Sequence, residues 1–205
     1  MTRVKICGLT NLEDALLAVD CGASALGFVF ADSPRRISPD QAREIVRGLP
    51  PFVATVGVFV DERPSRVAEI AAQVGLAAVQ LHGAEPPSAL AQLGQWRVIK
   101  ALHPRKAADL EQLAGYSTAS AFLLDTYRPE RAGGTGEAFD WTLARKAKDF
   151  GRPLILAGGL TVENVSEAIA LVRPFAVDVC TGVEARPGRK DRDKVARFIA
   201  AAREA

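Results

Sequence analysis

The feature that most constrains the fold is a repeat of one unit: a short apolar, β-branched run, a turn, and then a stretch with helical periodicity. These units are about 20 to 32 residues long, which is typical of a strand–helix pair. Strands that alternate with helices and are apolar on both faces predict a parallel sheet. The chain has about eight such apolar runs, which begin near Val4, Ala25, Val53, Ala77, Val98, Ala121, Leu154 and Ala176. Eight units predict an α/β fold of the (β/α)8 TIM-barrel type.

Helix signals lie between these runs. Leu12, Ala15 and Val19 recur on one face of the first intervening segment, and Ser38 precedes Pro39 as a predicted N-cap. We predict helices over 11–20, 39–47, 64–74, 86–93 and 162–172.

A doubly wound open sheet is the alternative architecture. Its first strand often leads into a glycine-rich dinucleotide turn. Here that turn is Cys7-Gly8-Leu9-Thr10, with no GxGxxG pattern. With no linker or composition break visible, we predict one barrel domain over residues 1–205.

Charge and composition exclude several functions. The 205 residues carry 26 Lys and Arg against 24 Asp and Glu, so the net charge of +2 gives no basis for nucleic-acid binding. No apolar run approaches the roughly 18 residues of a membrane span, and the first residues lack a signal-peptide pattern. The three cysteines have no metal-ligand spacing. We therefore expect a cytoplasmic protein with no metal site.

Strand alternation predicts which polar side chains point into the barrel. Burying such groups without partners costs several kcal/mol each, so several of them at strand ends indicate a functional site. Cys21 and Cys180 are interpreted as structural. The inward set is Lys5, Cys7, Gln80, His82, Asp125 and Asp178.

Individual members of this set have simpler interpretations. Asp125 ends the apolar run Ala121–Leu124, where partial desolvation raises a carboxyl pKa and suits a general acid, but it can also cap the following turn. His82 can be a core histidine. Lys5 either holds a carboxylate or steadies a thiolate. Lys100, also near a strand end, is a rival candidate as a Schiff-base nucleophile.

Glycine loops supply the remaining signals. Gly158 and Gly159 follow the seventh predicted strand, and Thr181 and Gly182 follow the eighth, where many barrels bind phosphate through backbone N–H groups. Residues 127–138, which contain Gly133, Gly134 and Gly136, predict a mobile loop after the sixth strand.

Taken in order, these motifs resemble the phosphoribosylanthranilate isomerase family, the barrel enzymes of tryptophan biosynthesis. The resemblance covers essentially the whole chain. It rests on Lys5–Thr10, Gly27–Phe30 with Ser33–Ser38, Val56–Phe59, Val79–Gly83, Leu123–Asp125, Gly133–Gly136 with Phe139–Trp141, Ala157–Leu160 and Asp178–Glu184.

The resemblance implies an Amadori rearrangement of N-(5'-phosphoribosyl)anthranilate, with Cys7 as general base, Asp125 as general acid and no cofactor. It implies that Arg35 grips the anthranilate carboxylate, although Arg36 alongside leaves that assignment open. The further substrate-binding residues that it implies are Asp178, Gln80 and His82. The phosphate-binding residues that it implies are Gly158, Gly159, Thr181 and Gly182. The active-site lid that it implies contains Gly133, Gly134 and Gly136. We expect Lys5 to raise the thiolate fraction of Cys7.

Three other functions remain open alternatives. They are a Schiff-base aldolase-like enzyme using Lys100, a phosphosugar-binding barrel without chemistry, and a histidine-pathway barrel, which typically uses two aspartates. The expected partner is a small phosphosugar substrate. A monomer is expected rather than a homodimer.

Overall fold

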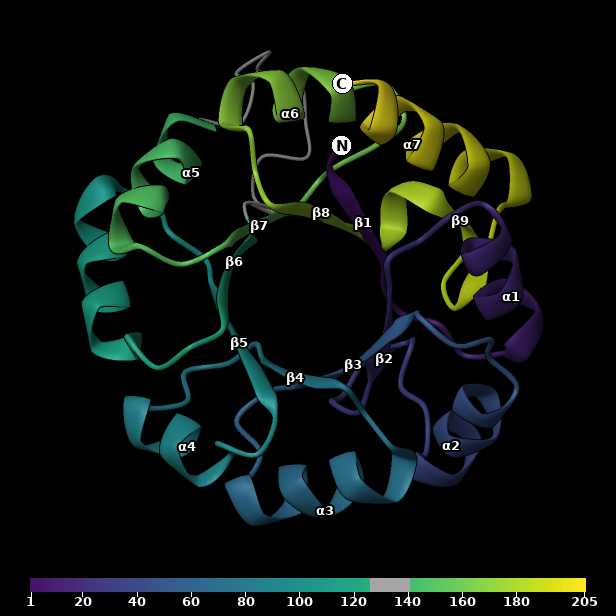
Figure 1. The fold of residues 1–205 in the computed structure, drawn as a ribbon, viewed down its shortest axis with the longest axis horizontal. Coiled ribbons are helices and arrows are strands. Elements are labelled where there is room, and N and C mark those ends of the chain that lie inside the picture. The colour runs from purple at the N-terminus through teal and green to yellow at the C-terminus, as the bar shows by residue number, and fades with distance from the viewer. Residues whose placement is uncertain (126–140) are drawn as a thin grey trace.

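Eight parallel strands close into one barrel in the computed structural model, which describes residues 1–125 and 141–205. Each strand pairs with the next in the chain, and β1 pairs with β8 to complete the ring (Figure 1). The strands are β1 (Arg3–Ile6), β2 (Ala25–Val29), β3 (Ala54–Phe59), β4 (Ala78–Leu81), β5 (Arg97–Leu102), β6 (Ala121–Asp125), β7 (Leu154–Ala157) and β8 (Ala176–Val179).

Helices surround this barrel on the outside, as Figure 1 shows. A two-stranded hairpin, β9 (Glu184–Arg186) and β10 (Arg189–Lys190), follows the last barrel strand. The α-helices are α1 (Leu12–Asp20), α2 (Pro39–Arg47), α3 (Pro64–Val74), α4 (Pro87–Gln92), α5 (Trp141–Ala147), α6 (Val165–Val172) and α7 (Arg192–Glu204). The 3-10 segments are η1 (Ala107–Tyr116), η3 (Lys148–Phe150) and η4 (Thr181–Val183). No helix in the described ranges is long and apolar enough to cross a membrane.

The predicted barrel is confirmed, and each strand starts within one residue of its predicted position. Helices α2 and α3 have the predicted bounds. The N-cap at Ser38 is also confirmed. Its hydroxyl accepts from the Gln41 backbone N–H at 3.2 Å, and the Gln41 side chain accepts from the Ser38 N–H at 3.1 Å.

Helix α6 begins at Val165, later than the predicted residue 162. The cause is a turn held by the Asn164 side chain. Its Oδ1 accepts from the Thr161 N–H at 2.8 Å, and its Nδ2 donates to the Gly159 carbonyl at 3.0 Å. The Asn164 side chain thereby holds residues 159–164 in a defined loop conformation after β7.

The strands separate two apolar layers. The larger one fills the space between strands and helices and includes Ile6, Phe28 and Phe122. The smaller one fills the barrel interior with small and medium side chains, namely Val56, Ala78, Ile99, Ala101, Ala121, Leu123, Ile155, Ala157 and Ala176. This division confirms the predicted alternation of inward and outward residues.

The structure corrects the interpretation of Lys100. Its neighbours Ile99 and Ala101 take the inward positions of β5, so Lys100 points into the outer layer. There its ammonium donates to Glu85 Oε2 at 2.6 Å and to the Gly83 carbonyl at 2.7 Å. Tyr116 completes the network by donating its hydroxyl to the Glu85 carbonyl at 2.8 Å. Lys100 is therefore a buried structural cation, and its assignment as a Schiff-base nucleophile is wrong.

Removing one partner from this buried pair is expected to destabilise the fold. Glu85→Ala leaves the Lys100 charge buried without its counter-ion, which typically costs about 3–5 kcal/mol. Urea denaturation followed by circular dichroism measures the loss. The control is Glu69→Ala, which breaks the exposed Arg66–Glu69 pair and is expected to leave the midpoint unchanged. Equal losses in the two variants would contradict the proposed importance of burial.

Candidate active site

One cavity of about 480 Å³ lies at the carboxyl ends of the strands. In barrels of this kind that end carries the active site, because the loops that follow the strands meet there. Every candidate site residue within the described ranges lines this cavity: Cys7, Arg35, Gln80, His82, Asp125, Gly158, Gly159, Asp178, Thr181 and Gly182. The predicted lid residues Gly133, Gly134 and Gly136 lie outside the described residues.

Cys7 follows β1 directly, and its surroundings are set by a buried ion pair at the β1–β8 seam. Lys5 faces Asp178 in the strand register, and Lys5 Nζ lies 2.9 Å from Asp178 Oδ2. Burial disfavours the ammonium, but the charges of Asp178 and Cys7 outweigh it and raise the pKa of Lys5. Lys5 therefore remains a fixed cation beside the thiol. Asp178 Oδ1 is buried and has no hydrogen-bond partner among the described residues.

The expectation that Lys5 favours the thiolate of Cys7 holds in direction only. Burial raises the pKa of the Cys7 thiol, and the nearby Asp178 charge adds to that rise. Lys5 and Lys190 act in the opposite direction without reversing it. Cys7 is therefore mainly a thiol at neutral pH, and Lys5 limits the cost of its ionisation.

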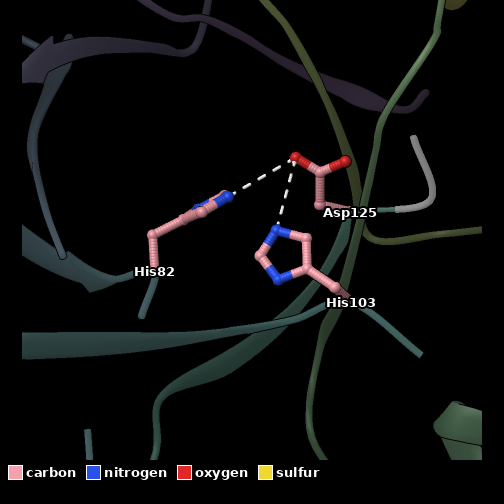
Figure 2. A group of neighbouring side chains, drawn as sticks. All are labelled: His82, His103 and Asp125. Carbon is pink, nitrogen blue, oxygen red and sulfur yellow. Dashed lines mark ion pairs between the residues drawn. The ribbon is translucent and has the colours of Figure 1, made fainter. Parts of the chain in front are cut away.

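Asp125, at the end of β6, faces two imidazoles (Figure 2). His82 Nε2 lies 3.4 Å from Asp125 Oδ2, and His103 Nε2 lies 4.0 Å from the same oxygen. The Gln80 amide donates to His82 Nδ1 at 2.7 Å, so the proton of a neutral His82 sits on Nε2, toward Asp125. His82 is thus a partner of Asp125 rather than a core histidine.

Sequence reasoning missed His103. It follows β5 in the way that His82 follows β4, and this shared position was the available signal. The two rings meet edge to face with centroids 4.9 Å apart. Burial lowers the pKa of His103, and the charge of Asp125 opposes that effect.

Arg35 reaches the cavity from the loop after β2. Its Nε lies 2.9 Å from Glu184 Oε1, and its Nη2 lies 2.6 Å from Glu184 Oε2. Lys190 contacts the same carboxylate at 3.1 Å, so two cations share one anion. Those contacts lower the pKa of Glu184 although burial opposes them. The cluster of Arg35, Lys190 and Glu184 therefore carries one excess positive charge at the cavity wall.

Arg36 is exposed and lines a separate depression with Phe30 and Glu62. Between the two arginines, Arg35 is therefore the one that faces the cavity. Glu184 and Lys190 were also missed by sequence reasoning, because their roles depend on the β9–β10 hairpin folding back toward Arg35. Cys180 lines the cavity as well, and burial raises the pKa of its thiol to about 12.

Two glycine loops form the wall next to Arg35. Gly158 and Gly159 have φ angles of 84° and 65°, a region that L side chains rarely adopt. Gly182 packs so closely against the Leu160 carbonyl that a Cβ there would overlap it. The loops after β7 and β8 are therefore in contact, with the backbone of both exposed to the cavity.

A closed parallel barrel whose polar side chains and glycine loops gather at the carboxyl ends of its strands defines the chain as a (β/α)8-barrel enzyme. Known proteins make this more specific. The family model described as N-(5'-phosphoribosyl)anthranilate (PRA) isomerase matches residues 4–201. The chain is 54% identical to the N-(5'-phosphoribosyl)anthranilate isomerase of Geobacter metallireducens, over 97% of this chain and 98% of that one. It is 55% identical to that of Desulforudis audaxviator, over the full length of both.

Solved structures agree with these relatives. The phosphoribosyl anthranilate isomerase of Thermotoga maritima superposes with a TM-score of 0.93 at 50% identity, covering 100% of both chains. A second isomerase structure, in complex with reduced 1-(o-carboxyphenylamino)-1-deoxyribulose 5-phosphate, gives a TM-score of 0.90 at 48% identity, again covering 100% of both. The chain belongs to the N-(5'-phosphoribosyl)anthranilate isomerase family, and its activity is the isomerase step of tryptophan biosynthesis.

Replacing Lys5 with Met is expected to raise the pKa of Cys7 further, because the cation that stabilises its thiolate is lost. The rate of Cys7 alkylation by iodoacetamide, followed against pH by mass spectrometry, should move to higher pH. Cys21 in the same sample is the control, since it lies outside the cavity at the end of α1. An unchanged Cys7 profile would show that Lys5 has no electrostatic effect on the thiol.

Proposed function

We propose that Asp125 is the general acid and Cys7 the general base of the rearrangement. Asp125 protonates the ribose ring oxygen, so that the furanose opens to an iminium. The adjacent carbon becomes acidic because the iminium accepts its electrons, and the Cys7 thiolate removes that proton. The resulting enolamine takes up a proton at the former anomeric carbon, loses its enol O–H proton and becomes the aminoketose.

The observation that carries this proposal is that Cys7 and Asp125 line one cavity from two separate strands, β1 and β6. A substrate between them can receive a proton from one group and give a proton to the other. The imidazoles beside Asp125 supply hydrogen-bonding partners for its two protonation states. Asp178 Oδ1, which is buried against the cavity and unpartnered within the described ranges, suits a substrate hydroxyl.

The excess positive charge around Arg35 supports its role as the partner of the anthranilate carboxylate. A guanidinium that already holds Glu184 in fixed geometry loses little freedom when it binds a second anion. Gly158, Gly159, Thr181 and Gly182 offer backbone and hydroxyl groups to a phosphate on the same wall. The related isomerase in complex with a reduced carboxyphenylamino-deoxyribulose phosphate supports a ligand that carries both anionic groups.

Loss of either proton-transfer group is expected to abolish most of the activity. Phosphoribosylanthranilate, generated in place from anthranilate and phosphoribosyl pyrophosphate by a separate transferase, is followed by its fluorescence decay. Cys7→Ser and Asp125→Asn should each slow the reaction by about 10²- to 10⁴-fold. Cys21→Ser is the matched thiol control and should keep the wild-type rate. A Cys7→Ala variant with substantial activity would remove Cys7 as the base.

The neighbouring residues Arg35 and Arg36 allow a matched test of which side chain binds the anthranilate carboxylate. Arg35→Ala is expected to raise KM by about 10- to 100-fold, since a charge-assisted hydrogen bond contributes about 1.5–3 kcal/mol. Arg36→Ala, which removes an exposed charge outside the cavity, should leave KM unchanged. Equal effects from the two variants would exclude a specific role for Arg35.

Three expectations remain predictions: one domain over residues 1–205, a cytoplasmic location, and a monomer rather than a homodimer. A Thermotoga maritima relative, 46% identical, is described as dimeric, with monomers generated from it. The exposed side chains of Phe52 and Phe175 lie at the opposite end of the barrel from the cavity. A dimer formed there would leave the site open.

A further inference from the structure

Three neighbouring strand ends bring both histidines of the chain to one carboxylate. His82 follows β4, His103 follows β5 and Asp125 ends β6. One donor atom from each residue lies within 4.8 Å of the other two. Figure 2 shows both imidazoles directed at the same oxygen of Asp125. Two imidazole nitrogens and one carboxylate oxygen form a donor set that zinc and other transition metals prefer.

Two of these three donor atoms already have the spacing of a tetrahedral metal site. Bonds of about 2.0–2.1 Å to nitrogen and oxygen place two ligands about 3.3–3.4 Å apart. His82 Nε2 and Asp125 Oδ2 are already 3.4 Å apart. His103 Nε2 is 4.0 Å from that oxygen and must move closer by about 0.6 Å. Since the His103 side chain is 50% exposed, a small rotation of its ring meets little resistance.

The surroundings leave room for a fourth ligand and for entry. His82 and Asp125 line the cavity, so the open coordination position faces the space in which a water molecule or a substrate sits. His103 borders solvent and provides the path by which an ion arrives. An open fourth position of this kind distinguishes a reactive or inhibitory metal site from a closed structural one.

The Gln80 amide can support the histidine tautomer that a metal requires once it rotates. Metal binding at His82 Nε2 needs the proton on Nδ1, and Nδ1 then needs an acceptor. The Gln80 amide now donates to Nδ1, while its own Oε1 is buried and without a partner in the described part of the chain. Rotating the amide by half a turn presents that oxygen to Nδ1, which is the supporting contact common to metal-bound histidines.

We propose that His82, His103 and Asp125 bind a divalent transition-metal ion such as Zn²⁺, and that the bound ion inhibits the isomerase. Binding rests on the donor geometry, a short movement of His103 and a rotation of the Gln80 amide, and it is independent of the proposed function. Inhibition rests on the proposed function, because an ion on Asp125 Oδ2 prevents that carboxyl from carrying the proton for ring opening. The site is therefore a point of competition between a metal ion and a proton.

Binding is tested with Co²⁺ as a spectroscopic probe of the metal-free protein near pH 7.5. Wild type should bind one ion and show the visible absorption of cobalt held by nitrogen and oxygen, with no sulfur charge-transfer band. His103→Ala changes a half-exposed side chain that would bind the metal directly. Its loss should weaken cobalt binding by more than 100-fold, since loss of a residue that only supports a ligand typically costs about 10- to 100-fold. Cys7→Ser and Cys180→Ser are the thiol controls and should retain the spectrum.

Several outcomes overturn the metal site. Equal affinity in His103→Ala and wild type, or a sulfur charge-transfer band that disappears in a cysteine variant, would assign the ion to other residues. Absence of any cobalt spectrum in folded wild type would also reject the site.

Inhibition is tested separately with Zn²⁺ in the fluorescence assay. Zn²⁺ should slow wild type, and a chelator should restore the rate. Each variant is compared with its own metal-free rate, and the half-inhibitory Zn²⁺ concentration should rise in His103→Ala by the same factor as the cobalt Kd. Cobalt binding at the cluster without Zn²⁺ inhibition would retain the metal site, reject its inhibitory role and count against Asp125 as the acid.

Discussion

The ion pair between Lys5 and Asp178 crosses the seam at which the barrel closes, between residues that are 173 positions apart in the chain. It lies inside a barrel filled mostly by small and medium apolar side chains, where either charge is costly without the other. The pair therefore requires the register of β1 against β8 that brings the two residues face to face. Because Cys7 lies two residues beyond Lys5, the same contact also sets the charge balance around the thiol of the active site.

A comparison of two lysines shows how strand alternation divides function from support. Lys5 points into the barrel and meets Asp178 beneath the cavity, whereas Lys100 points outward and meets Glu85 under the helical layer. Both ammonium groups are buried and paired. The two lysines differ in their parity along the strand. This parity places Lys5 beside the active-site thiol and Lys100 where it stabilises the contact of β4, β5 and η1.

Most of the architecture and much of the site could be predicted from the sequence, since periodicity and strand parity are local properties. They were sufficient to predict eight strands and the convergence of Cys7, Asp125 and Asp178. What they missed depends on contacts between distant segments. Glu184 became visible as the partner of Arg35 only once the β9–β10 hairpin was in place, and His103 only once β5 lay between β4 and β6. The side on which Lys100 projects was missed because the residues around it in β5 are apolar at both parities, so the sequence does not show which parity faces the barrel.

The inner layer of the barrel has a consequence for how this scaffold changes. Five of its residues are alanines: Ala78, Ala101, Ala121, Ala157 and Ala176. Ala157, at the end of β7, lines the cavity, whereas Ala78, Ala121 and Ala176 begin their strands at the opposite end of the barrel. Enlarging Ala157 by two methyl groups would narrow the cavity from within while the side chain of Arg35 stays as it is. The space inside the cavity and the chemistry of its polar groups thus depend on different residues, so the size of the accepted ligand can change independently of the reaction performed on it.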